Sequence, residues 1–234
     1  MNREQSSDHA RLILQQAAMM ATTSLRGYAK HYILWKLRLD PAYTLLAQQS
    51  HSWGHVLDVG CGPAIVSLLA AARGDAASYT GVDLDETKLR TADRLLASLP
   101  VRDHVNWKAL RCRLPDDPLP AGPFDTAMLL DVLHYWPVDM QEQMLTLIRQ
   151  KLHVSSILYL RDGLANDRGR TGLVGLGERF TTFMGLNPRV RKLHFLSRQQ
   201  MHEMLDRTGF AVESIHAAGG VNELWVCRVR SAQA

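Results

Sequence analysis

The chain has 234 residues, of which 46% are hydrophobic and 21% are charged, and its formal net charge is +4. A chain of this size and composition can bury a core, so we expect a folded globular protein rather than a disordered one. No apolar run approaches the ~18 residues that a membrane span needs. The polar residues 1–9 lack the regions of a signal peptide, and we expect them and residues 231–234 to be frayed. These features favour a cytoplasmic protein without stable membrane insertion.

The charge and the cysteines exclude two further classes of site. The positive excess is mild and spread along the chain, so it does not indicate nucleic acid binding. Cys61, Cys112 and Cys227 are far apart and do not have zinc-ligand spacing with histidine. We therefore predict no disulfide framework and no metal site.

Residues 11–40 have the pattern of one or two helices. Apolar residues recur three or four positions apart and form a stripe of Leu25, Tyr28, Tyr32, Trp35 and Leu39. Asp40 is the expected cap of the next helix, and Pro41 is its expected first residue. The interleaved basic residues Arg26, Lys30, Lys36 and Arg38 do not share one helical face. A solvated exterior is therefore favoured over a membrane-surface or acidic-partner role. We predict a helical extension or cap over residues 1–50 and a second unit over residues 51–234.

The segment 55–72, HVLDVGCGPAIVSLLAAA, predicts a buried strand, a turn on Gly60 and Gly62, and a helix with Pro63 as its first residue. Glycine permits positive φ and close approach of a ligand, and a helix N-terminus offers unpaired N–H groups. The turn is thus a candidate cofactor cradle. The dinucleotide fingerprint needs a small third residue, and that position is Ile65, which disfavours a nicotinamide cofactor.

Three further strands are predicted over residues 78–83, 104–110 and 124–132. Asp83 ends the first of them, 23 residues after Gly60, where nucleotide-binding units place a ribose-binding carboxylate. Asp85 is the expected cap of the following helix. The segment after residue 124 ends in Asp131, His134 and Tyr135. These residues should lie near the ligand, because the carboxyl ends of parallel strands face the binding crevice.

The last third of the chain predicts a helix opening on a capping pair, Asp139 and Glu142, and a strand over residues 157–160. The glycine-rich segment 163–196 has the composition of a cover over the site. Ser197 and Gln200 form a capping box for a later helix, and the final two strands form a hairpin.

The combination of Asp58-x-Gly60-x-Gly62-x-Ala64 with Asp83 and with LLDVLHYW resembles class I S-adenosylmethionine (SAM) methyltransferases. The resemblance implies an α/β fold, a Rossmann-like seven-stranded sheet with an antiparallel final strand. It implies SAM as cofactor and S-adenosylhomocysteine as product. It also implies a cofactor site made of Asp58, Gly60, Cys61, Gly62, Asp83, Leu84, Arg113, Asp131 and Val132. Members of this family often bind the adenine amino group with a Gly-Asp pair after the third strand, which this chain lacks. Asp116 and Asp117 are possible substitutes.

The segment around His134 resembles the Leu-His-Asp-Trp stretch of phenol-type O-methyltransferases, in which the histidine removes the hydroxyl proton. By this resemblance His134 is the candidate general base, and a purely packing role is the alternative. Tyr135 and Asp162 are weaker candidates that would orient the substrate or the base. No metal is required for this reaction.

A narrower resemblance, on WKLRLDPAY, DVLHYW, YLRDGL and the segment around HFLS, is to methyltransferases of bacterial aryl-polyene and related polyketide-type pigment clusters. It implies secondary metabolism and an aromatic acceptor, free or linked to an acyl carrier protein, with oxygen or ring carbon methylated. A non-catalytic SAM-binding partner subunit is the alternative function, and a nicotinamide-dependent oxidoreductase is the third. The chain is expected to be a monomer or a homodimer.

Overall fold

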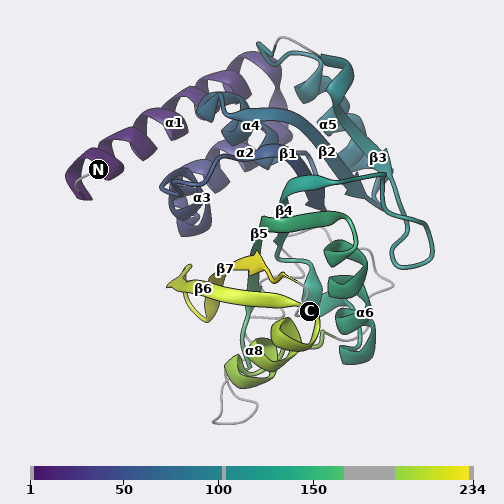
Figure 1. The fold of residues 1–234 in the computed structure, drawn as a ribbon. Helices are drawn as coiled ribbons and strands as arrows, with labels where there is room; N and C mark the ends of the chain where they lie inside the picture. Colours follow the sequence, from purple (N-terminus) through teal and green to yellow (C-terminus); the bar gives the residue numbers. More distant parts are fainter. Residues whose placement is uncertain (1–2, 102–103, 166–192, 232–234) are drawn as a thin grey trace.

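The computed structural model describes residues 3–101, 104–165 and 193–231. Its strands form a seven-stranded sheet with the order β3-β2-β1-β4-β5-β7-β6 (Figure 1). They are β1 (Gly54–Val59), β2 (Ala76–Asp83), β3 (Trp107–Arg111), β4 (Phe124–Leu130), β5 (Leu152–Gly163), β6 (Phe210–Ala217) and β7 (Asn222–Val229). The first five strands are parallel, and β7 is antiparallel to β5 and β6. This confirms the predicted α/β sheet with its antiparallel final strand.

Helices cover both faces of the sheet. One face carries α1 (Arg3–Ser24), α2 (Gly27–Leu39), α3 (Pro41–Ala47), α4 (Ile65–Arg73) and α5 (Glu86–Leu96), and the other carries α6 (Val138–Arg149) and α8 (Arg198–Arg207). Neighbouring strand residues point to opposite faces, so Val56 belongs to the first hydrophobic cluster and Leu57 to the second. The result is three layers, with short 3-10 turns η1 (His104–Asn106) and η2 (Leu133–Tyr135) at the strand ends.

The N-terminal helices differ from the sequence-based expectation in two ways. Helix α1 begins at Arg3, so the expected fraying of residues 1–9 is wrong from that residue onward. Helix α2 buries Ile33, Lys36 and Leu37 rather than the predicted aromatic stripe, of which Tyr28 and Trp35 are exposed. The apolar spacing of α2 fits more than one face, and packing against α1 and α3 selects the face that also carries Lys36.

Most predicted helix ends are confirmed, because caps depend on residues close in sequence. The confirmed caps are Asp40 before α3, Asp85 before α5, and the Ser197 and Gln200 capping box before α8. The predicted capping pair of α6 is wrong, since Pro137 occupies the cap position without a side-chain bond. Glu142 instead accepts a hydrogen bond from Arg207 of α8 at 2.9 Å, and so joins two helices.

Two predicted strands have different bounds in the structure. Residues 104–106 form η1, and β3 begins only at Trp107. Strand β5 is much longer than residues 157–160 and extends through Gly163, because its second half pairs with β7. This extension places Asp162 inside a strand rather than in a loop.

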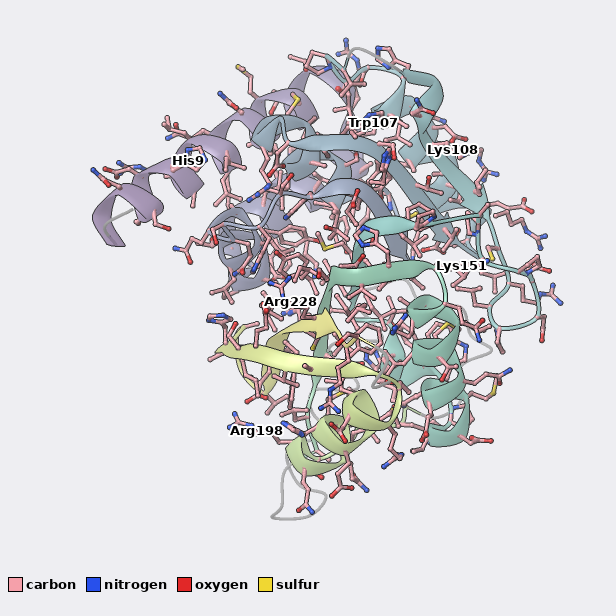
Figure 2. The ribbon with its side chains drawn as sticks, in the orientation of Figure 1. His9, Trp107, Lys108, Lys151, Arg198 and Arg228 are labelled. Carbon is pink, nitrogen blue, oxygen red and sulfur yellow. The ribbon has the colours of Figure 1, made fainter. Side chains whose placement is uncertain are left out.

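The basic side chains and the cysteines are spread over several parts of the chain. Of the labelled basic side chains, Lys108, Arg198 and Arg228 lie on β3, α8 and β7, and Lys151 lies between α6 and β5 (Figure 2). The three cysteines are free and buried. In the part of the chain that the structure describes, no helix is long and apolar enough to span a membrane, and no cluster of three metal-ligating side chains occurs.

Candidate functional site

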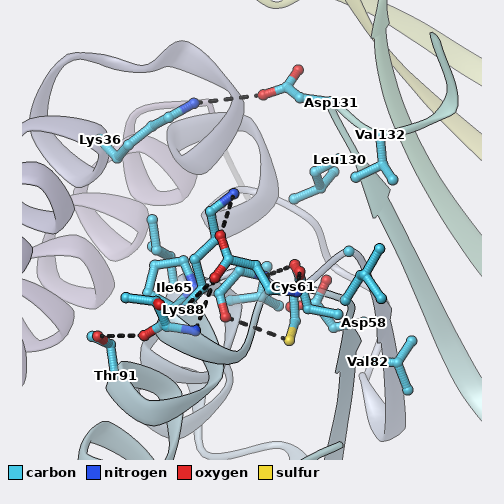
Figure 3. Close-up of a pocket in the computed structure, with 18 of the residues that line it drawn as sticks. Lys36, Asp58, Cys61, Ile65, Val82, Lys88, Thr91, Leu130, Asp131 and Val132 are labelled. Carbon is cyan, nitrogen blue, oxygen red and sulfur yellow. Dashed lines mark hydrogen bonds and ion pairs between the residues drawn. The ribbon is translucent and has the colours of Figure 1, made fainter. Parts of the chain in front are cut away.

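A cavity of about 760 Å³ lies at the carboxyl ends of β1, β2 and β4, with α2 along its side (Figure 3). Nine predicted site residues line it: Asp58, Gly60, Cys61, Gly62, Asp83, Leu84, Asp131, Val132 and Tyr135. Three others, Arg113, His134 and Asp162, do not appear in its lining. The position agrees with the rule that ligands of open α/β sheets bind beyond the carboxyl ends of the strands.

The turn after β1 is held in a left-handed backbone conformation at alternate residues. Gly60, Gly62 and Ala64 have φ values of 74°, 54° and 61°. A Cβ atom on Gly60 would lie 2.4 Å from the side chain of Val132, so a larger residue does not fit there. Helix α4 starts only at Ile65, after Ala64, and the predicted helical start at Pro63 is wrong. Ala64 therefore adopts a left-handed conformation that glycine would adopt without strain.

Asp83 connects the glycine turn to the start of α5. Its two carboxylate oxygens accept hydrogen bonds from the Gly62 amide and from the Asp85 amide, each at 2.8 Å. Each oxygen therefore keeps a lone pair for a further donor. The carboxylate is partly exposed to the cavity and can bind the two adjacent hydroxyls of a ribose.

Asp58 lies deeper, at the end of β1, and is almost fully buried. Burial raises its pKa to about 7, although its hydrogen bond from the Tyr79 hydroxyl (2.6 Å) opposes that shift. A cationic ligand group in the cavity would favour the ionised form of this carboxyl group. The site thus contains an acid that can change its charge when a ligand binds.

Beyond β3, the structure brings to the cavity a residue that the sequence analysis did not assign to the site. Cys112 is buried and lines the cavity, whereas Arg113 is exposed and its amide donates to Asp117 at 2.7 Å. Asp116 and Asp117 are exposed and also do not line the cavity. Arg113 therefore lies outside the cavity lining, because the chain turns after Cys112 and the arginine side chain is exposed.

A charged cluster lies at the other end of the cavity, where β4 ends. Asp131 has a φ of 58° and accepts a hydrogen bond from Arg161 of β5. Arg161 also contacts Asp40 at 3.3 Å, and Lys36 contacts Asp40 at 2.8 Å and Asp131 at 3.5 Å. All four side chains are at least nine-tenths buried. The expected solvated exterior is therefore wrong for Lys36, which carries its charge to the cavity wall (Figure 3).

The N-terminal helices also supply aromatic groups that sequence reasoning did not assign to the site. Tyr28, Tyr32 and Tyr43 line the cavity, together with Trp136. The rings of Tyr28 and Tyr32 stack with their centroids 6.2 Å apart. Their spacing of four residues indicated a shared helical face, but not that this face meets a cavity.

His134 and Asp162 form a buried pair beside the cavity. The Nδ1 atom of His134 lies 2.5 Å from Asp162, which also accepts the His134 amide at 2.9 Å and the Gly163 amide at 2.8 Å. The His134 ring lies 4.4 Å from the ring of Tyr135 and 4.9 Å from that of Phe195. The His134 ring thus contacts Tyr135, which lines the cavity. The hydrogen bond to Asp162 fixes the orientation of the imidazole.

The predicted glycine-rich cover falls mainly on residues 166–192, which lie outside the described residues. The described end of the segment packs on the His134 region. The His194 amide donates to the His134 carbonyl at 2.8 Å, and Gln141 donates to the His194 carbonyl at 2.7 Å. The end of the segment is thereby attached next to the candidate base.

Comparisons with known proteins bear on the family and the fold of this chain. Residues 56–154 match a family model described as a methyltransferase domain. No curated protein matches the chain in sequence.

Three solved structures illustrate the structural similarity. The apo SAM-dependent methyltransferase SibL is 18% identical, with a TM-score of 0.66 over 97% of this chain and 70% of its own. Human N-acetylserotonin methyltransferase in complex with SAM is 15% identical, with a TM-score of 0.63 over 94% and 58%. The mitomycin 7-O-methyltransferase MmcR is 15% identical, with a TM-score of 0.61 over 94% and 68%. The fold is thus that of class I methyltransferases, and the chain spans less than two thirds of the human protein's chain.

Proposed function

We propose that this chain, which carries a methyltransferase domain over residues 56–154, transfers a methyl group from SAM to a small aromatic or hydroxylated acceptor. The observation that carries the proposal is the position of Asp83, which lines the cavity 2.8 Å from the amide of the glycine turn. A carboxylate there suits a ribose, and the cavity volume is within the range of small-molecule sites.

The residues of the cavity fit this cofactor along its length. Asp83 would bind the ribose, and Leu84 and Cys112 would contact the adenine. Gly60 and Gly62, which line the cavity, would face the methionine portion. Asp58 and Asp131 supply negative charge toward the cationic end. The bound cofactor supplies an electrophilic methyl group on a sulfonium sulfur.

His134 is the proposed general base for a hydroxyl acceptor. Asp162 accepts from its Nδ1, so the neutral ring has Nε2 as its basic atom and can take a proton there. Asp162 then stabilises the imidazolium that forms. Tyr135, which lines the cavity and contacts the His134 ring, would position the acceptor. Both O-methylation and ring C-methylation of a phenol use such a base.

The acceptor class rests on the aromatic lining and on the resemblance to pigment-cluster enzymes. Tyr28, Tyr32 and Trp136 offer flat apolar surface at the cavity for an aromatic ring. We place the reaction in secondary metabolism, including aryl-polyene-type pathways, with the acceptor free or attached to an acyl carrier protein. The mitomycin 7-O-methyltransferase, which shares the fold, is named for methylation of an oxygen.

Cofactor binding is tested by calorimetry with S-adenosylhomocysteine. The unaltered chain should bind it, and Asp83→Ala should weaken binding by at least about tenfold, because two charge-assisted hydrogen bonds are lost. Asp93→Ala, on the exposed side of α5, is the matched control and should bind normally. Absence of binding to the unaltered chain would refute the proposal.

Catalysis is tested with labelled SAM and hydroxybenzoyl compounds, free and carrier-linked. His134→Ala should lower kcat at least about a hundredfold while S-adenosylhomocysteine affinity stays nearly unchanged. Asp162→Asn should also lower kcat, because the imidazolium that forms loses the carboxylate beside its Nδ1. Full activity of His134→Ala would show that His134 is not the general base and has only a packing role. Tight cofactor binding without turnover on any acceptor would favour the alternative, a non-catalytic SAM-binding subunit.

A further inference from the structure

Lys36 is a buried cation that reaches the cavity from α2, outside the matched methyltransferase segment. Its side chain is 9% exposed, and its ammonium group contacts Asp40 at 2.8 Å and Asp131 at 3.5 Å. Burial lowers the pKa of this ammonium group, but Asp131 and Asp40 outweigh burial and hold the pKa above its ordinary value. Lys36 is therefore charged in the free protein.

The two acids of the cluster do not depend on Lys36 alone. Arg161 contacts both Asp40 and Asp131, and it also donates to the Ala218 carbonyl at 3.1 Å. Arg161 does not line the cavity, whereas Lys36 and Asp131 do. An ammonium group has three donors, so Lys36 can bind a ligand while it keeps its bond to Asp40.

The order of the strands shows which part of the cofactor meets Lys36. Asp83 ends β2 and takes the ribose, and β3 lies on one side of β2 while β1 and β4 lie on the other. With adenine toward Cys112 after β3, the amino acid tail extends toward Asp131 at the end of β4. The described cationic side chains of the lining are Lys36 and Lys88, and Lys88 lies near Asp85 at the ribose end (3.9 Å).

We infer, on the basis of the proposed function, that Lys36 binds the α-carboxylate of the cofactor's methionine portion, while Asp131 beside it faces the α-ammonium group. The loose 3.5 Å pair of opposite charges in the cavity wall is complementary to an amino acid zwitterion (Figure 3). The N-terminal helices thus contribute a cofactor-binding residue as well as part of the core.

Three nucleosides distinguish binding of the α-carboxylate by Lys36 from a change in the cavity that would weaken the binding of every nucleoside. S-adenosylhomocysteine carries the whole amino acid tail, S-adenosyl-3-thiopropylamine lacks only the carboxylate, and 5′-methylthioadenosine lacks both charged groups. Lys36→Met keeps an unbranched apolar stem. It should weaken S-adenosylhomocysteine binding about 10- to 100-fold in calorimetry, because one charge-assisted hydrogen bond is lost. Binding of the other two nucleosides should not weaken by more than about threefold.

Lys30→Met, on the same helix but outside the cavity lining, is the matched control and should bind all three as the unaltered chain does. An equal loss for all three nucleosides in Lys36→Met would overturn the inference, but would leave the proposed function intact. Binding of none of them by the unaltered chain would overturn both.

A measurement on the unaltered chain keeps the inference testable if Lys36→Met does not fold. S-adenosylhomocysteine should bind at least about tenfold more tightly than S-adenosyl-3-thiopropylamine, since only the first carries the carboxylate. Equal affinities would show that no cation in the cavity recognises the carboxylate, and would refute the assignment to Lys36.

Discussion

At the scale of single residues, the carboxyl groups in the cavity differ in how they are held. Asp83 accepts hydrogen bonds from two backbone amides, whereas Asp58 is buried and accepts a hydrogen bond from the Tyr79 hydroxyl. The first arrangement favours a carboxylate that is ready to bind hydroxyl groups. Burial raises the pKa of Asp58 to about 7, so this carboxyl group can ionise when a positively charged ligand binds beside it.

We predict that Asp58 makes the stability of the ligand-free protein pH-dependent. Its pKa is about 7 in the folded state and about 3.9 when unfolded, so the folded state binds the extra proton between these values. The free energy of unfolding should therefore fall as pH rises from 4 to 7, by up to roughly 4 kcal/mol from this group. Urea unfolding of the unaltered chain and of Asp58→Asn across this range measures the effect. The variant should gain relative stability toward high pH, and parallel curves would contradict the prediction.

At the scale of the elements, the turn between β1 and α4 concentrates the backbone constraints of the site. Gly60 needs both a positive φ and the absence of a side chain, because of Val132. Ala64 needs only the positive φ, at a cost that glycine would not have. The two positions should therefore respond in opposite ways to exchange between alanine and glycine.

Gly60→Ala should destabilise the protein by at least about 2 kcal/mol, because strain at φ 74° adds to the clash with Val132. Thermal and urea unfolding measure the change, and calorimetry with S-adenosylhomocysteine should show weaker binding. Gly74→Ala at the end of α4 is a control, since it has a positive φ but no atom within 4 Å of the added Cβ. It should cost less than Gly60→Ala.

Ala64→Gly should leave stability unchanged or raise it by up to about 1 kcal/mol. The relief of left-handed strain is partly offset by the greater freedom of glycine in the unfolded chain. The same unfolding measurements apply, and cofactor affinity should remain close to that of the unaltered chain. A loss of more than about 1 kcal/mol would show that the alanine methyl group is needed for packing.

At the scale of the whole molecule, the cluster of Lys36, Asp40, Asp131 and Arg161 joins the N-terminal helices to the carboxyl ends of β4 and β5. The two negative charges of its acids are compensated by the two positive charges of its bases, and all four side chains are buried. Such clusters are costly to break because the remaining charges lose their partners. The cluster therefore couples the position of α2 to the geometry of the cofactor site.

Arg161→Met should destabilise the protein by about 3–5 kcal/mol, since Asp40 and Asp131 are left with Lys36 alone. Urea unfolding at neutral pH measures the loss. Arg207→Met is the comparison, because this arginine pairs with Glu142 on the surface and its removal should change stability little. A small effect of Arg161→Met would show that the cluster is not needed to hold the helices.

The features that could be predicted from the sequence are those that depend on residues close together in the chain. The glycine turn, Asp83 at its strand end, and the caps at Asp40, Asp85 and Ser197 were predictable, because each depends on a few neighbouring residues. The resemblance to class I methyltransferases supplied the seven-stranded sheet and its antiparallel final strand. The α6 capping pair was wrong, because Glu142 binds Arg207, 65 positions away in the chain.

The sequence by itself determined the order of strands and helices along the chain and the glycine turn, with Asp83 at the end of the next strand. Only the tertiary structure decided that α2 turns Lys36 inward, that Cys112 rather than Arg113 lines the cavity, and that His134 is buried against Asp162. These placements depend on packing between segments that are far apart in the chain, such as Lys36 with Asp131. Periodicity can identify a helix, but the face it buries depends on the surface against which it packs.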